Sequence, residues 1–230
     1  MVADFKTASF VHLKRKGLTA EFMTCVRPDK GNCSGFHYNF SLWDSQGRNV
    51  FADPDDCGKL SELGRHWLAG MVEHAPAMAA LVCPTINCYR RIGAPWAPKF
   101  ANWSQEVRTG TFRLKIEPGG NVYIENRLPS SACSPHLVLA ATLAAGMDGV
   151  RRKLDLPQPL EESRRLPTTL EKALDVLEGD LILKAALGDN LVDMYIYAKR
   201  SFEIDEFKAF GELSDDEMLL KEKEYYYFPY

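Results

Sequence analysis

Histidine, carboxylate and guanidinium groups gather on the polar sides of three segments with strand-like alternation. Glu125 and Arg127 are two residues apart, so both project from the same side of a strand. His37 and Arg113 occupy the polar sides of the other two segments. A histidine and a carboxylate on neighbouring strands could hold a divalent metal, and arginines could bind phosphate or carboxylate. A solvated sheet face with a lone hydrogen-bonded His37 is the alternative that the pattern leaves open.

The alternation of apolar and polar residues predicts strands at 36–43, 111–117 and 122–128. The turn-forming residues at 118–121, Pro-Gly-Gly-Asn, predict that the last two strands form an antiparallel hairpin. We therefore expect His37 and Glu125 to face each other in one cavity, with Arg127 nearby.

Apolar residues at helical spacing predict the helices that support these strands. One helix spans 59–73 and is interrupted or ended by Pro76; a second, 137–153, is apolar nearly all round and is expected to be the most buried. Thr168 or Thr169 caps a helix over 170–177. Gly188 separates two further helices, the second with an apolar stripe at Leu191, Met194, Tyr195, Ala198 and Phe202.

Composition excludes several classes of protein. The net charge of −3 argues against a basic nucleic-acid binder, and the longest apolar run, 137–145, is too short to span a membrane. The first residues lack the apolar segment of a signal peptide, which favours a cytoplasmic location. The six cysteines have no metal-binding or redox spacing, so we expect reduced, mostly buried thiols and no disulfide scaffold.

Five blocks, in this order, resemble the C-terminal part of the glutamine synthetase catalytic domain. They are 31–42 (GNCSGFHYNFSL), 74–77 (HAPA), 84–91 (PTINCYRR), 124–129 (IENRLP) and 137–150 (LVLAATLAAGMDGV). The resemblance implies an α+β fold with an antiparallel sheet that has one polar cavity face, is backed by helices and is followed by a helical C-terminal part. It divides the chain into a partial catalytic domain (1–153), a linker (154–169) and the helical part (170–230), with the family's front half and small N-terminal sheet domain absent. It further implies an unpaired edge near 18–26 or 36–43, and such an edge favours self-association or partner binding.

The resemblance also implies roles for the polar side chains. His37 and Glu125 match metal ligands, and Asn39 and Ser41 match nucleotide contacts. The remaining matches are arginines: Arg91 and Arg127 correspond to groups that bind the glutamate carboxylate, and Arg108 and Arg113 to groups that face the transferred phosphate.

Departures from the family pattern favour a protein that has lost catalysis and kept these groups as a vestigial site. Tyr123 stands in place of an arginine, Cys33 in place of a glycine and Ser130 in place of an aspartate, and the loop 91–98 carries no carboxylate. Each lost electrostatic contact typically costs on the order of 3–4 kcal/mol of transition-state stabilisation.

The narrower resemblance, to the family's non-enzymatic lens proteins, implies a structural or chaperone-like partner of intermediate filament proteins such as vimentin or beaded-filament proteins. The implied protein forms homo-oligomers, a dodecamer when full length, and binds neither nucleic acid nor membrane. It requires no cofactor, although weak binding of Mg²⁺ or Mn²⁺ and ATP is compatible with the remaining residues. The alternatives are a residual ATP-dependent glutamate–ammonia ligase and a sensor that binds ATP or an amino acid.

Overall fold

A four-stranded sheet lies at the centre of the protein. The computed structural model describes residues 2–27, 33–56, 58–117, 121–162 and 164–226. The strands are β1 (Tyr38–Phe40), β2 (Trp103–Ser104), β3 (Phe112–Glu117) and β4 (Asn121–Asn126), in the sheet order β1-β4-β3-β2. β4 pairs antiparallel with both β1 and β3, and β2 runs parallel to β3. The predicted hairpin is confirmed, although residues 118–120 of its turn lie outside the described residues.

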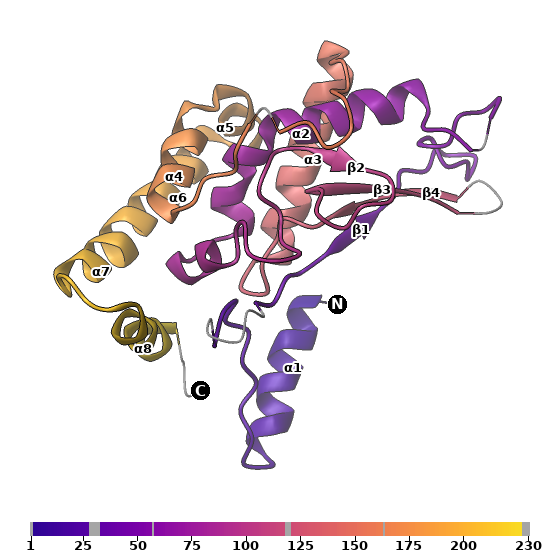
Figure 1. The fold of residues 1–230 in the computed structure, drawn as a ribbon. Coiled ribbons are helices and arrows are strands. Elements are labelled where there is room, and N and C mark those ends of the chain that lie inside the picture. The colour runs from indigo at the N-terminus through magenta and orange to yellow at the C-terminus, as the bar shows by residue number, and fades with distance from the viewer. Residues whose placement is uncertain (1, 28–32, 57, 118–120, 163, 227–230) are drawn as a thin grey trace.

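Helices account for most of the remaining chain and complete an α+β fold, as the sequence predicts. They are α1 (Val2–Lys14), α2 (Glu62–Val82), α3 (Pro135–Arg152), α4 (Leu170–Gly179), α5 (Leu181–Leu187), α6 (Asp189–Lys199), α7 (Asp205–Ala209) and α8 (Asp215–Tyr226), with a 3₁₀ turn η2 (Ile86–Arg90) and a π-helical turn η3 (Arg200–Ile204). Figure 1 shows α2 and α3 crossing beside the sheet, the C-terminal helices gathered on one side of α2, and α1 extending away from this body.

Helix α2 is the most buried helix of the fold. Its N-terminus is capped by Ser61, whose hydroxyl accepts a hydrogen bond from the Gly64 amide. The helix continues through Pro76, so the prediction that this proline ends it is wrong. An internal proline costs about 3 kcal/mol of helix stability, but the apolar residues on both sides of Pro76 are buried, and their packing outweighs that cost.

Glycines allow α2 and α3 to cross with their backbones nearly in contact. A Cβ atom on Gly70 of α2 would lie 2.2 Å from the Ala145 carbonyl oxygen and 2.7 Å from the Cα of Gly149, both on α3. A Cβ on Gly146 would overlap the indole of Trp67. Only glycine fits at these positions, because the neighbouring atoms are backbone or a rigid ring.

The helix pair supports the sheet through one face of the hairpin. Val122 and Ile124 of β4 are fully buried in the same apolar core as α2 and α3, together with Phe112 and Leu114 of β3. Because side chains alternate across a strand, burying these residues turns Glu125 to the opposite face of the sheet.

The burial predicted for two helices differs from the structure. α3 is less buried than predicted, since Leu139, Leu143 and Met147 form a partly exposed stripe. On α6, Val192 and Ile196 are buried, whereas Met194 of the predicted stripe is 72% exposed. Both helices carry apolar residues on more than one side, so their periodicity does not determine which side meets the core.

The cysteine prediction is also partly wrong. Cys83, Cys88 and Cys133 are buried free thiols, as expected, but Cys25 and Cys33 form a disulfide. A hydrogen bond from the Ser34 amide to the Thr24 carbonyl, 2.7 Å long, brings the two cysteine segments side by side. This tertiary contact places the two Cα atoms 4.5 Å apart, within the range that a disulfide requires.

A buried histidine joins three helical segments. His74 of α2 contacts the Asp180 carboxylate through Nδ1 at 2.6 Å and the Asp148 carboxylate through Nε2 at 3.0 Å. Burial lowers the pKa of His74, but the hydrogen bonds and charges of the two aspartates outweigh this effect and raise the pKa above its ordinary value. His66 is bonded to the Leu154 carbonyl oxygen. These contacts give both histidines structural roles.

The helix crossing predicts a strong effect for Gly70→Ala. We expect it to lower the free energy of unfolding by about 3 kcal/mol, because the added methyl group meets backbone atoms that cannot yield. Urea denaturation followed by circular dichroism measures the change. The matched control is Gly179→Ala at the end of α4, where a Cβ meets nothing within 4 Å and the change should stay below about 1 kcal/mol. Equal losses in both variants would contradict the close crossing.

His74 predicts a characteristic dependence of stability on pH. Its folded-state pKa lies above the ordinary 6.5, so its contribution is fully present below pH 6.5 and is lost as pH rises through the folded pKa. Burial raises the pKa of Asp180, but its bond to His74 lowers it overall; the Asp180 contribution is therefore lost as pH falls through that folded pKa. Urea denaturation across pH should show stability declining above pH 6.5. In His74→Gln this decline should disappear, and an unchanged profile would refute the assignment.

Candidate active site

The residues predicted to do chemistry meet on the face of the sheet opposite the helix pair. Glu125 of β4 is buried, with its Oε1 3.0 Å from Nδ1 of His37 and 3.3 Å from an NH1 nitrogen of Arg127. Its Oε2 lies 3.7 Å from Arg113 and 3.6 Å from the Nζ of Lys115. The expected approach of His37, Glu125 and Arg127 is therefore confirmed.

This cluster carries an excess of positive charge. Burial raises the pKa of Glu125, but Arg127, Lys115, His37 and Arg113 outweigh it, so the carboxylate is ionised at neutral pH with a lowered pKa. One negative charge thus faces three permanent positive charges within 4 Å. Such an imbalance attracts anions, and arginine and lysine bind phosphate and carboxylate groups well.

His37 is neutral at pH 7. Burial and the charge of Arg127 lower its pKa below 6.5, although Glu125 opposes the shift. With Nδ1–H donated to the carboxylate, Nε2 keeps its lone pair and could accept a metal ion. Glu125 Oε2 is buried and has no hydrogen-bond partner. Both atoms are of the kinds that divalent cations take as ligands, and neither has a hydrogen bond to any described residue. Within the described residues no group of three or more His, Cys, Asp and Glu side chains could hold a metal ion.

A small cavity opens beside the cluster. Its volume is about 280 Å³, and its walls combine cationic groups with an apolar loop: Cys33, Gly35, His37, Arg91, Ala94, Pro95, Trp96, Ala97 and Arg127. The Trp96 carbonyl oxygen accepts a hydrogen bond from Arg127 at 3.2 Å. Trp96 itself has a positive φ of 65°, an uncommon conformation for a bulky residue. The loop that carries Trp96 therefore forms one wall of the cavity.

Arg91 fixes the position of this wall. Its guanidinium donates to the carbonyl oxygens of Leu128 at 3.0 Å and Arg127 at 2.8 Å. A Cβ on Gly35 would lie 2.7 Å from an Arg91 nitrogen, so a larger residue at position 35 would displace this guanidinium. Burial lowers the pKa of Arg91. Arg91 thus contributes charge to the cavity and also holds the chain that follows β4.

The other predicted site residues lie around the cluster. Asn39 is directly paired with Glu125 across the β1–β4 ladder, so the two residues share a face of the sheet. The Ser41 hydroxyl accepts a hydrogen bond from the Trp43 indole. Arg108 is exposed on the loop before β3 and, together with Arg113, lowers the pKa of Arg127, which burial already lowers.

Lys115 and Trp96 were missed as site residues. Lys115 lies two positions after Arg113 on the same strand, and this period of two was a usable signal that both cations share a face. The hydrogen bond from Arg127 to the Trp96 carbonyl could not be predicted from the sequence, since every residue has a backbone carbonyl group.

A second cavity, of about 640 Å³, lies between η2, α4, α7 and α8. Its charged groups are already paired: Arg90 with Glu222, and Lys208 with Glu171. It is larger than the cavity beside Glu125 but offers no comparable excess of charge. We therefore assign the chemistry to the smaller cavity.

No helix in the described part of the chain is long and apolar enough to cross a membrane.

An α+β domain with a buried carboxylate surrounded by cations is suited to binding anionic groups. Residues 2–218 match the family model described as the glutamine synthetase catalytic domain, and the chain belongs to that family. It is 35% identical over 210 residues to glutamine synthetase from Methanosarcina mazei, covering 84% of this chain and 46% of the relative. It is 38% identical over 207 residues to glutamate–methylamine ligase from Methyloversatilis universalis, covering 80% of this chain and 45% of the relative.

Solved structures show the same fold. A complex of GmaS with ADP has a TM-score of 0.80 and 32% identity, covering 94% of this chain and 52% of that one. A structure described as a novel glutamine synthase homologue has a TM-score of 0.82 and 30% identity, covering 98% and 53%. The chain spans about half the length of the curated relatives it matches.

The comparisons correct the functional prediction. The matched relatives are named as glutamine synthetases and a glutamate–methylamine ligase, which contradicts an inactive partner of intermediate filament proteins. The narrower resemblance to lengsin, the lens protein, is not supported by these matches. The departures at Cys33, Tyr123 and Ser130 do not by themselves show a loss of catalysis, because arginine and lysine side chains still supply positive charge around Glu125 and the cavity.

The charge cluster predicts opposite effects of two substitutions on His37. Arg127→Gln should raise the pKa of His37, because it removes a nearby positive charge. Glu125→Gln should lower the pKa further, because it removes the opposing carboxylate. NMR titration of the imidazole signals measures both shifts, with the solvent-exposed His136 on α3 as the internal reference. Shifts of the same sign in both variants would contradict the geometry.

Proposed function

We propose that this chain forms part of the catalytic domain of an ATP-dependent ligase that joins glutamate to ammonia or a small amine. The observation that carries the proposal is the cationic cluster around Glu125, beside a cavity large enough for an amino acid. The names of the matched relatives support both the reaction and the choice of amines. Homo-oligomerisation, which the family resemblance implies, is part of the same proposal.

Arg127 is the best placed group for the glutamate carboxylate. It lines the cavity, and its buried Nε has no hydrogen-bond partner. Arg91 lines the same cavity and adds positive charge, while its bonds to backbone carbonyls keep the wall in place. The contact between Arg127 and the Trp96 carbonyl fixes the guanidinium before substrate binds, which reduces the entropy lost on binding.

Arg113 and Lys115 are the groups we assign to the transferred phosphate, with Arg108 at the edge of the site. Phosphoryl transfer depends mainly on cations that neutralise developing charge. Tyr123 supplies no charge, but Lys115 lies opposite it in the β3–β4 ladder, with its ammonium 5.3 Å from the centre of the Tyr123 ring. Lys115 therefore offers on the neighbouring strand the positive charge that the family pattern has at position 123.

Nε2 of His37 and Oε2 of Glu125 are the atoms that would hold a divalent cation, with Asn39 and Ser41 on the nucleotide side. Such a cation would supply positive charge that stabilises the negative charge of the transferred phosphate. Two protein ligands alone bind Mg²⁺ weakly, because it prefers octahedral coordination with waters and substrate phosphates. Tight metal binding is therefore expected only together with nucleotide.

The test is formation of product from glutamate, ATP, Mg²⁺ and either ammonium or methylamine, with ADP and the γ-glutamyl amide measured by mass spectrometry. Arg127→Gln should reduce the rate by roughly 10²–10³, as expected for loss of one charged contact. Arg151→Gln, which removes an exposed arginine at the end of α3, is the matched control and should leave the rate unchanged. Absence of product, or equal rates in the two variants, would overturn the proposal.

A further inference from the structure

The disulfide joins a fixed part of the protein to the wall of the candidate cavity. Cys33 lines the cavity together with Gly35, Arg91 and Arg127, and its side chain is partly exposed. Cys25 is completely buried. One sulfur therefore lies where small molecules can reach it, and the other lies in the interior.

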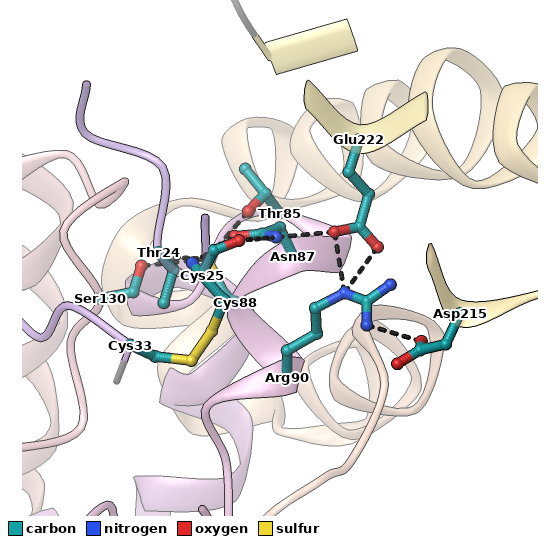
Figure 2. Close-up of a disulfide and its surroundings, with 10 residues drawn as sticks. All are labelled: Thr24, Cys25, Cys33, Thr85, Asn87, Cys88, Arg90, Ser130, Asp215 and Glu222. Carbon is teal, nitrogen blue, oxygen red and sulfur yellow. Dashed lines mark hydrogen bonds and ion pairs between the residues drawn. A yellow bond between two sulfur atoms is a disulfide. The ribbon is translucent and has the colours of Figure 1, made fainter. Parts of the chain in front are cut away.

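Cys25 is held by a network that does not depend on the disulfide. Its amide donates to Oδ1 of Asn87 at 2.7 Å, and its carbonyl accepts from Nδ2 of the same side chain at 2.9 Å. Asn87 also donates to the buried carboxylate of Glu222 on α8, which accepts from Arg90 at 2.9 Å. Figure 2 shows this chain of bonds running from the disulfide through Asn87 to α8.

The Cys33 side is attached to the rest of the protein through backbone hydrogen bonds, including one from the Ser131 amide to the Ser34 carbonyl at 3.3 Å. Ser34 donates its amide to the Thr24 carbonyl at 2.7 Å, and Phe36 donates to the Pro129 carbonyl at 2.8 Å. Both Cys33 and Ser34 are at least partly exposed to solvent, so these bonds compete with water. The disulfide is thus the covalent part of the attachment between this wall and the buried anchor.

We propose that the Cys25–Cys33 pair is a redox-sensitive switch that controls how well ordered the cavity wall at 33–37 is. When the disulfide is formed, the wall is tied to the Asn87 anchor and the cavity is ready for an anionic substrate. When it is reduced, the wall keeps only its hydrogen bonds and samples open conformations. The consequence for substrate affinity rests on the proposed ligase function, whereas the change in order does not.

The reductant is a dithiol. Its thiolate attacks the accessible sulfur of Cys33, the sulfur–sulfur bond breaks, and Cys25 leaves as a thiolate that takes up a proton. The second thiol of the reductant then attacks the mixed disulfide, which releases Cys33 as a thiol and leaves the reductant as a cyclic disulfide. Two electrons and two protons pass to the protein. Arg91 and Arg127 beside Cys33 favour the approach and release of thiolates.

The other described cysteines are unsuited to this chemistry. Burial raises the pKa of the Cys133 thiol to about 12, and burial also raises that of Cys83 well above its ordinary value. Cys88 is buried, and its sulfur lies within 3.0 Å of the hydroxyls of Thr85 and Ser130. Among the described residues, the response to a dithiol is therefore assigned to the Cys25–Cys33 pair.

The first measurement is the linkage itself. After equilibration with oxidised glutathione, peptide mapping by mass spectrometry under non-reducing conditions should find Cys25 joined to Cys33. Dithiothreitol should convert both to free thiols in the folded protein. If both thiols remain free in the oxidised sample, the proposal is overturned.

The second measurement is amide hydrogen exchange of the oxidised and reduced protein. Reduction should accelerate exchange at Ser34 and Phe36 by roughly tenfold or more, because a short-loop cross-link has been lost. The Cys25 amide, held by Asn87, should stay protected in both states. Amide exchange in Cys33→Ser should match that of the reduced protein and should not change on addition of dithiothreitol. Cys88→Ser, which keeps a hydroxyl beside the same partners, should respond to dithiothreitol like the wild type. Equal exchange in the two redox states would overturn the proposal.

Glutamate binding by calorimetry separates this proposal from the proposed function. Weaker binding in the reduced state, by roughly tenfold, would support both. If glutamate binds in neither state, the ligase proposal fails, while a redox-dependent exchange rate at Ser34 still supports the redox switch. If glutamate binds equally in both states and exchange is also unchanged, the redox switch fails alone.

Discussion

The close crossing of α2 and α3 is the constraint on which the rest of the structure depends. Gly70 and Gly149 bring two helix backbones into contact, and the indole of Trp67 covers Gly146. The resulting layer buries Val122 and Ile124. Since strand side chains alternate, that burial decides which way the charged residues of β4 point. A change in the helix crossing would therefore alter the positions of the charged side chains at the site, although no glycine of the crossing contacts them.

Two histidines, one buried and one partly exposed, show how the same side chain is set to opposite charge states. His74 has two carboxylates as partners and is favoured in its protonated form, which joins α2, α3 and the start of α5. His37 has one carboxylate, which it shares with Arg127, and is favoured in its neutral form. The first arrangement stabilises the fold. The second keeps a nitrogen lone pair free for a ligand, at the expense of burying uncompensated positive charge.

Function in this family cannot be judged by counting motif residues that have changed. Tyr123 does not supply an arginine's charge, yet Lys115 places an ammonium on the adjacent strand within 3.6 Å of Glu125. Electrostatic stabilisation depends on where a charge lies in space and not on which strand carries it. The family membership and the named relatives are consistent with a site whose charges have been redistributed.

The sequence by itself determined the β3–β4 hairpin, a cap of α4 at Thr168 or Thr169 and the shared face of Glu125 and Arg127, because these depend on local periodicity and turn chemistry. The α+β class followed from the family resemblance. Five motifs in order also identified the family. The course of α2 through Pro76, the buried sides of α3 and α6, the Cys25–Cys33 disulfide and the Trp96 carbonyl contact were decided only by tertiary structure. Each of these depends on segments distant in the chain, whose packing outweighs a local preference or creates a contact that no local pattern encodes.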